Sequence, residues 1–131
     1  MKLTDKVALI TGGTKGIGAA CAIDLAKRGA DIVINGRNHD AEATAVKAAI
    51  EELGRKCEVI LADVSIPEEA RRCVADTVAK MGRVDVLVHS AGGLVAGGLF
   101  EITPDEWMKG FDTHVHAIFH LTRAIVPHMR K

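Results

Sequence analysis

The chain has 131 residues, of which 48% are apolar and 26% are charged, a composition typical of one globular domain with its own core. Lysine plus arginine and aspartate plus glutamate number 17 each, so the formal net charge is zero. Balanced charge gives no electrostatic basis for binding nucleic acid or an anionic membrane, and we expect neither partner.

The first predicted element is a buried strand, Val7–Ile10, a short apolar run with β-branched residues. Glycines follow at positions 12, 13, 16 and 18. Apolar residues at helical spacing then predict a helix over 18–28, and Gly29 follows where a helix end favours a left-handed residue. The glycines therefore lie in a strand-to-helix turn.

Such a turn lets the backbone approach a pyrophosphate and points the first amides of the helix at the phosphates. A glycine cluster alone is weak evidence, because loops also use glycine for positive φ without binding anything. The strand before the cluster and the helix after it favour phosphate binding over a purely structural turn.

Strands and helices alternate along the rest of the chain. We predict strands over 32–35, 57–61 and 84–89, and helices over 39–53, from 65 to about 81, and from 103 to the C-terminus in one or two pieces. Ser65-Ile66-Pro67-Glu68 and Thr103-Pro104-Asp105-Glu106 are each typical of a capping box that starts a helix.

Short strands separated by helices favour parallel pairing with right-handed crossovers. The predicted fold is α/β, a doubly wound Rossmann-type parallel sheet of four strands in the order 3-2-1-4, flanked by helices. A ligand is expected in the crevice at the carboxyl ends of strands 1 and 4, where the strand order reverses. The glycine-rich stretch 92–98 follows the fourth strand above this crevice.

The three cysteines, at positions 21, 57 and 73, are odd in number and lack metal-ligand spacing. They are interpreted as small core residues in a reducing compartment. No apolar run approaches the length of a membrane span, and the first six residues lack the apolar stretch of a signal peptide. We therefore expect a cytoplasmic protein.

Several segments together resemble the short-chain dehydrogenases/reductases. The turn Thr11–Gly18 is similar to the cofactor turn of that family, and the similarity continues through Ala62–Val64, Val84–Gly92 and Thr122–Met129. The resemblance spans essentially all of the chain but only the N-terminal half of a usual member. It implies that residues 1–131 are an NAD(P)-binding Rossmann-like domain, incomplete relative to the family and truncated before the fifth strand.

The resemblance also implies roles for individual residues. Three turn glycines would shape the phosphate cradle, Ile17 would pack beneath the cofactor, and Ala91 and Gly92 would line the nicotinamide ribose with backbone. His89 and Ser90 stand where the family more often has two asparagines. The expected cofactor-binding residues are Gly12, Thr14, Lys15, Gly16, Ile17, Gly18, Arg37, Asn38, Asp63, Val64, His89, Ser90, Ala91 and Gly92.

Asp63 would accept a hydrogen bond from the adenine amino group beside the Val64 amide, according to the same resemblance. The alternative is a strand-end residue near the N-terminus of the next helix. We favour the adenine role because Ser65 is predicted to fill the cap of that helix.

The coenzyme is predicted from the end of the second strand. An NAD site places a carboxylate there for the ribose 2′-hydroxyl, but the chain reads Asn35-Gly36-Arg37-Asn38. Arg37 and Lys15 suit a 2′-phosphate instead, so NADP(H) is favoured over NAD(H). The alternative is that both are ordinary solvated surface residues.

Hydride transfer between a nicotinamide and a carbonyl or alcohol is the activity that the resemblance implies. The family uses a Ser, a Tyr and a Lys four residues after the Tyr, and this chain contains no tyrosine. The one catalytic position of the family that this chain contains, a helical Asn, is occupied by His114. We therefore assign no catalytic residue. His116 and His120 share a helix face but have no evident third ligand, and no metal site is expected.

Two interpretations are left open. In the first, the chain is the dinucleotide-binding half of an enzyme that resembles NADP-dependent carbonyl reductases and alcohol dehydrogenases. It would bind coenzyme without turnover and meet its carbonyl or alcohol substrate only when completed by a C-terminal half. In the second, it is a stand-alone, non-enzymatic dinucleotide-binding or assembly module. A homo-oligomer is expected in either case, because the fourth strand leaves an apolar sheet edge.

Overall fold

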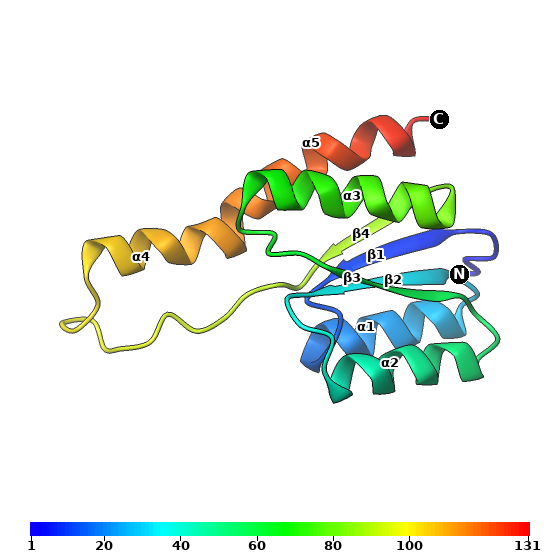
Figure 1. The fold of residues 1–131 in the computed structure, drawn as a ribbon, viewed down its shortest axis with the longest axis horizontal. Coiled ribbons are helices and arrows are strands. Elements are labelled where there is room, and N and C mark those ends of the chain that lie inside the picture. The colour runs from blue at the N-terminus through cyan, green and yellow to red at the C-terminus, as the bar shows by residue number, and fades with distance from the viewer.

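The computed structural model describes residues 1–131 and contains a parallel four-stranded sheet with helices on both faces (Figure 1). The strands are β1 (Val7–Thr11), β2 (Asp31–Gly36), β3 (Cys57–Leu61) and β4 (Val86–His89). Their order across the sheet is β3-β2-β1-β4, which confirms the predicted topology. All three adjacent pairs are parallel.

The helices form two layers around the sheet. They are α1 (Gly16–Lys27), α2 (Ala41–Glu52), α3 (Pro67–Met81), α4 (Pro104–Phe111) and α5 (Ala117–Met129), and a π-helical turn, η1 (Asp112–His116), joins α4 to α5. Helices α1 and α2 cover one face, and α3 and α5 cover the other (Figure 1). Helix α4 projects away from the sheet and has no buried residue (Figure 1).

Alternation along β1 divides the core between the two layers. Val7 and Leu9 join the cluster beneath α3 and α5, whereas Ala8 and Ile10 join the cluster beneath α1 and α2. Each large aliphatic side chain buried in this way contributes about 1.5–3 kcal/mol. Burial on both faces holds β1 at the centre, so the turn that follows it has a fixed starting point.

Two of the three cysteines are core residues, as predicted. Cys57 and Cys73 are buried, and burial raises the pKa of each thiol to about 12. Neither thiol is therefore ionised near neutral pH. Cys21 is only partly buried on α1.

The capping box predicted at Ser65 is wrong. Helix α3 begins at Pro67 with Ile66 at the N-cap, and no side chain caps it. The Ser65 hydroxyl instead donates to Oδ1 of Asp63 at 2.6 Å. The second predicted box is confirmed, because Thr103 and Glu106 bond each other reciprocally at the start of α4.

The fourth strand is shorter than predicted, since it begins at Val86 rather than Val84. The Asp85 carboxylate accepts a hydrogen bond from the Val7 amide through Oδ2, at 2.9 Å. The same carboxylate binds the Arg83 guanidinium at 2.6 Å. This side-chain contact anchors the start of β4 beside the start of β1.

Strand β4 forms one edge of the sheet, and its residues are only half-buried. An apolar edge with free backbone groups favours pairing with another chain. Ile118 and Phe119 on α5 add exposed apolar surface.

We expect a polypeptide of these 131 residues to self-associate at micromolar concentration. Size-exclusion chromatography with light scattering measures this directly, and a clean monomer would contradict it.

Candidate functional site

A cleft of about 820 Å³ opens at the carboxyl ends of the strands. One wall is the β1–α1 turn together with the residues that follow β2 and β3. The other wall is the segment after β4 with one side of α4 and η1. The cleft lies at the point where the strand order reverses, which is the usual ligand position in open parallel sheets.

Two glycines of the β1–α1 turn adopt backbone conformations that side chains disfavour. Gly12 has φ +62° and Gly16 has φ +57°. A Cβ at Gly12 would lie 2.8 Å from the backbone of Ala91. The turn therefore packs directly against the segment after β4, and the two walls of the cleft meet at this contact.

Helix α1 presents its N-terminus to the cleft. Lys15 is the N-cap residue but its side chain makes no capping hydrogen bond, and the first turn contains no acidic residue. The first amides of a helix without a cap carry partial positive charge and need acceptors. The arrangement suits an anionic group, and phosphate is a common ligand of such helix ends.

Two cations stand at the rim of the cleft. Lys15 Nζ lies 3.7 Å from Oε2 of Glu42, and both side chains are more than half exposed. Exposed pairs of this kind contribute little, so Glu42 does not hold Lys15 in place. Arg37, which follows β2, lines the same cleft and is exposed.

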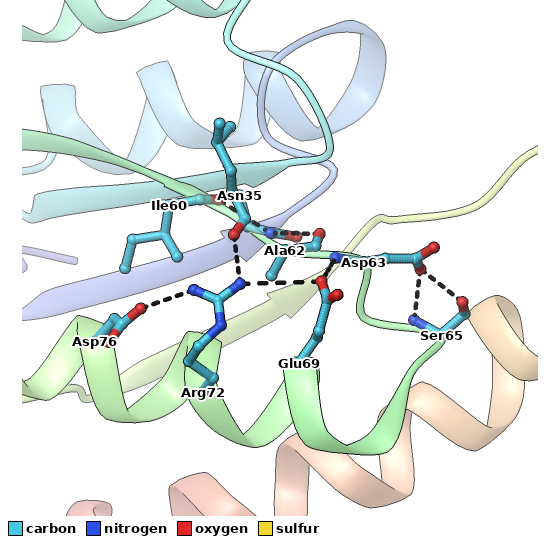
Figure 2. Close-up of polar contacts among 9 residues, drawn as sticks. Asn35, Ile60, Ala62, Asp63, Ser65, Glu69, Arg72 and Asp76 are labelled. Atoms are coloured by element: carbon cyan, nitrogen blue, oxygen red, sulfur yellow. Dashed lines mark hydrogen bonds and ion pairs between the residues drawn. The ribbon is translucent and has the colours of Figure 1, made fainter.

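Asn35 ties the ends of β2 and β3 together. Its side chain is buried, and Nδ2 donates to the carbonyls of Ile60 and Ala62 at 3.1 Å each (Figure 2). The Asn35 carbonyl accepts the Gly13 amide at 3.0 Å. One buried residue therefore fixes the glycine turn relative to the chain that leaves β3.

Asp63 is held in a hydrogen-bond network at the start of α3 (Figure 2). Oδ1 accepts from the amide of Ser65 at 3.0 Å and from its hydroxyl at 2.6 Å. The Asp63 amide donates to the Glu69 carboxylate, and Arg72 donates to the Leu61 carbonyl at 2.8 Å. Oδ2 of Asp63 has no partner within the chain, and Asp63 lines the cleft.

His89 makes a brace between three elements. Nδ1 lies 2.7 Å from Oγ1 of Thr11, and Nε2 lies 2.8 Å from the Thr113 carbonyl. The ring is about half-buried, and burial lowers the pKa of His89. The histidine thus supplies side-chain hydrogen bonds at a position where the family more often has an asparagine.

His114 holds the segment that follows β4. Its Nε2 donates to the Gly93 carbonyl at 2.9 Å, and its ring occupies the space where a Cβ at Gly92 would stand. Because His114 lies in η1, this contact connects η1 to the glycine-rich segment within the same wall of the cleft.

Residues 6–131 match the model of the short chain dehydrogenase family. The chain belongs to this family. It is 41% identical to an uncharacterized oxidoreductase of Methylorubrum extorquens, over 98% of this chain and 52% of that protein. The chain spans about half the length of the curated relatives it matches.

Solved structures of short-chain dehydrogenases share the fold. A Burkholderia cenocepacia short chain dehydrogenase in complex with NADP has a TM-score of 0.92 and 38% identity, over 98% of this chain and 53% of that chain. The NADH-dependent reductase A1-R′ complexed with NAD has a TM-score of 0.89 and 32% identity, over 98% and 54% respectively. Both coenzymes therefore occur among similar structures.

Most of the residues that the sequence analysis assigned to the coenzyme line the cleft. They are Gly12, Thr14, Lys15, Gly16, Ile17, Arg37, Asp63, Val64, Ser90, Ala91 and Gly92. Gly18, Asn38 and His89 do not line it. Gly18 lies under the turn against the Gly12 carbonyl, Asn38 is exposed outside the cleft, and His89 forms the brace described above.

Sequence reasoning missed the wall formed by α4 and η1. Glu106, Lys109, Gly110 and Thr113 line the cleft, but their sequence shows only that a helix begins at Thr103. The direction of that helix depends on tertiary contacts. Asn35 was a detectable signal, because an amide inside a buried strand requires hydrogen-bond partners.

His116, the last residue of η1, and His120 on α5 contact different partners. His116 Nδ1 lies 3.1 Å from Oδ1 of Asp112, and the His120 ring contacts Phe119 edge to face. No group of three or more potential ligands lies close enough together to hold a metal ion. None of the helices combines the length and apolarity needed to cross a bilayer.

Gly18→Ala tests the close packing beneath the turn. The added methyl group would collide with the Gly12 carbonyl, so we expect a loss of about 1–3 kcal/mol in the free energy of unfolding. Gly98→Ala is the matched control, because a Cβ there meets only ordinary van der Waals contacts and the change should stay within about 0.5 kcal/mol. Urea denaturation measures both, and equal effects would show that Gly18 is not packed as described.

Proposed function

We propose that these residues form the dinucleotide-binding half of a short-chain oxidoreductase and bind NADP(H) in preference to NAD(H). The observation that carries the proposal is the uncapped N-terminus of α1, which opens onto the cleft with Lys15 and Arg37 at the rim. No acidic residue lies at the end of β2 beside it.

The linked phosphates of the coenzyme would lie on the β1–α1 turn. The amides at the start of α1 supply donors, and the glycines let the backbone come close without side chains. Ile17, which is 79% exposed and lines the cleft, offers an apolar surface that a bound nucleotide would cover.

The adenine would lie beside Asp63. Ser65 and the Asp63 backbone orient this carboxylate, which still has Oδ2 to accept a hydrogen bond from an amino group. Ser65 does not cap α3, so the predicted cap no longer favours the adenine role over a strand-end role. The support now comes from the free oxygen and its place on the cleft.

The preference for NADP(H) depends on charge at the end of β2. A 2′-phosphate there would meet the Arg37 guanidinium, which can bind it through two parallel hydrogen bonds, and the Lys15 ammonium. A ribose 2′-hydroxyl would find no carboxylate in the last residues of β2 or directly after it. Glu42 pairs with Lys15 and disfavours an anion at this place.

The nicotinamide end would lie between Ser90, Ala91 and Gly92, which offer mainly backbone to the cleft. The hydride chemistry belongs to the coenzyme, but the proton must come from a protein group or water. The chain has no tyrosine to supply it in the manner of the family. We therefore propose that these 131 residues bind coenzyme without turning over a carbonyl or alcohol substrate.

The coenzyme preference is tested by fluorescence titration with NADPH and NADH. We expect tighter binding of NADPH, and Arg37→Asp should reduce NADPH affinity by about tenfold or more. The variant should not weaken NADH binding, because it places a carboxylate where an NAD site has one, so the gap between the two affinities should narrow or invert. Glu42→Gln should strengthen NADPH binding, because it removes the carboxylate beside Lys15.

Arg123→Asp is the matched control, since it makes the same charge change on α5 outside the cleft. It should leave the ratio of the two affinities unaltered. Equal affinity of the unmodified protein for both coenzymes would refute the assignment of Lys15 and Arg37.

The expected lack of turnover is tested separately. Purified protein is mixed with NADPH and a panel of ketones, and the absorbance of the reduced nicotinamide is followed. No sustained oxidation above the rate without protein is expected, because no tyrosine is present to transfer the proton. Turnover that co-purifies with the protein would show that another group supplies it.

A further inference from the structure

The hydrogen-bond partners of His89 determine which of its two ring nitrogens carries a hydrogen. The Thr113 carbonyl can only accept, so Nε2 carries the hydrogen in the 2.8 Å contact. In a neutral ring Nδ1 is then an acceptor, and the Thr11 hydroxyl donates to it at 2.7 Å.

The Thr11 hydroxyl has no spare capacity. Its oxygen also accepts the amides of Ser90 at 3.2 Å and Ala91 at 3.3 Å. Thr11 is completely buried, so water cannot replace a lost partner. The single hydroxyl proton and both lone pairs are therefore committed to named groups.

Protonation of His89 is incompatible with this arrangement. A hydrogen on Nδ1 would face the hydroxyl hydrogen of Thr11, and the hydroxyl could accept it only by releasing the amide of Ser90 or Ala91. The Ser90 amide also donates to the Thr11 carbonyl at 3.1 Å and would keep that acceptor, whereas the Ala91 amide would lose its own. The hydroxyl hydrogen of Thr11 would also lose Nδ1 as its acceptor in a place that water does not reach, and such losses cost free energy. Burial of the ring acts in the same direction and lowers the pKa of His89.

Other charges near the brace do not favour the imidazolium form. His114 on η1 is the titratable group whose charge acts on His89, and it opposes a second positive charge. Asp112 and His116 on the same turn pair with each other at 3.1 Å. From β1 and β4, the groups that contact the ring and its partners are neutral.

The two backbone amides that donate to the Thr11 hydroxyl come from residues that line the cleft. Ser90 and Ala91 line it, and Ala91 lies against Gly12 of the phosphate turn. A displacement of either amide would therefore reach both the nicotinamide end and the β1–α1 turn.

We propose that His89 is a positioning residue that works only as a neutral imidazole, so that acid loosens the nicotinamide end of the dinucleotide cleft. The proposal rests on the proposed function for its ligand but not for the brace itself. The device is particular to a histidine at this place, because an amide side chain could make comparable bonds without titrating.

The sign of the pH effect follows from the proton count. Binding and stability supported by the brace are complete above the ordinary histidine pKa of about 6.5 and are lost as the pH falls through the lowered pKa of His89. If only the neutral form binds coenzyme, affinity falls by about tenfold for each pH unit below that pKa.

The test is calorimetric titration of NADP⁺ between about pH 5 and pH 8 with the unmodified protein, His89→Asn and His114→Asn. The 2′-phosphate of the ligand titrates at roughly pH 6 and changes all three curves equally. We expect His89→Asn to retain only this common change. His114→Asn should keep the additional loss of affinity at low pH seen in the unmodified protein.

The opposite result, in which His114→Asn abolishes the additional loss and His89→Asn keeps it, would overturn the proposal. Nitrogen NMR of the imidazole rings gives a readout without ligand. We expect His89 to be the Nε2–H tautomer with a pKa below about 6.5, and a Nδ1–H tautomer or a higher pKa would also overturn it. Failure of NADP⁺ to bind at every pH would contradict the proposed function, and the NMR result would then decide the brace alone.

Discussion

The contact between the backbone of Gly12 and that of Ala91 is the constraint on which the site depends. It joins the turn after β1 to the segment after β4, and a side chain at Gly12 would occupy the same space. Three further restraints converge on it: Gly18 beneath the turn, the Asn35 carbonyl on Gly13, and Thr11 holding the Ala91 amide. Buried hydrogen bonds and close backbone packing therefore fix the position of the β1–α1 turn relative to the segment after β4.

The electrostatics of the cleft are local. The chain has no net charge, so it exerts little long-range attraction on an anion. Attraction begins only near α1, where uncapped amides, Lys15 and Arg37 face the cleft. Such an arrangement discriminates between ligands by the position of their phosphates rather than by their total charge.

Much of the fold could be predicted from the sequence, because β1 and β2 are short apolar runs with glycines at their carboxyl ends. The sheet order follows from the alternation of strands and helices. The phosphate turn was predictable for the same reason. The start of β4 was not, since Asp85 uses its side chain on Val7. Nor was the Ser65 contact with Asp63, because hydroxyl partners depend on local geometry. The wall formed by α4 depends on tertiary placement, which periodicity does not encode.

Helix α4 supplies part of the cleft, yet none of its residues is buried. It approaches the glycine-rich stretch closely at Gly110, where an added Cβ would lie 2.7 Å from the Val95 side chain. A wall with so little buried surface is held by few packing contacts, so ordering it further around a ligand would cost conformational entropy. If the cleft binds coenzyme as proposed, its affinity would be a balance between the hydrogen bonds formed at the β1–α1 turn and the conformational entropy lost by the wall that contains α4.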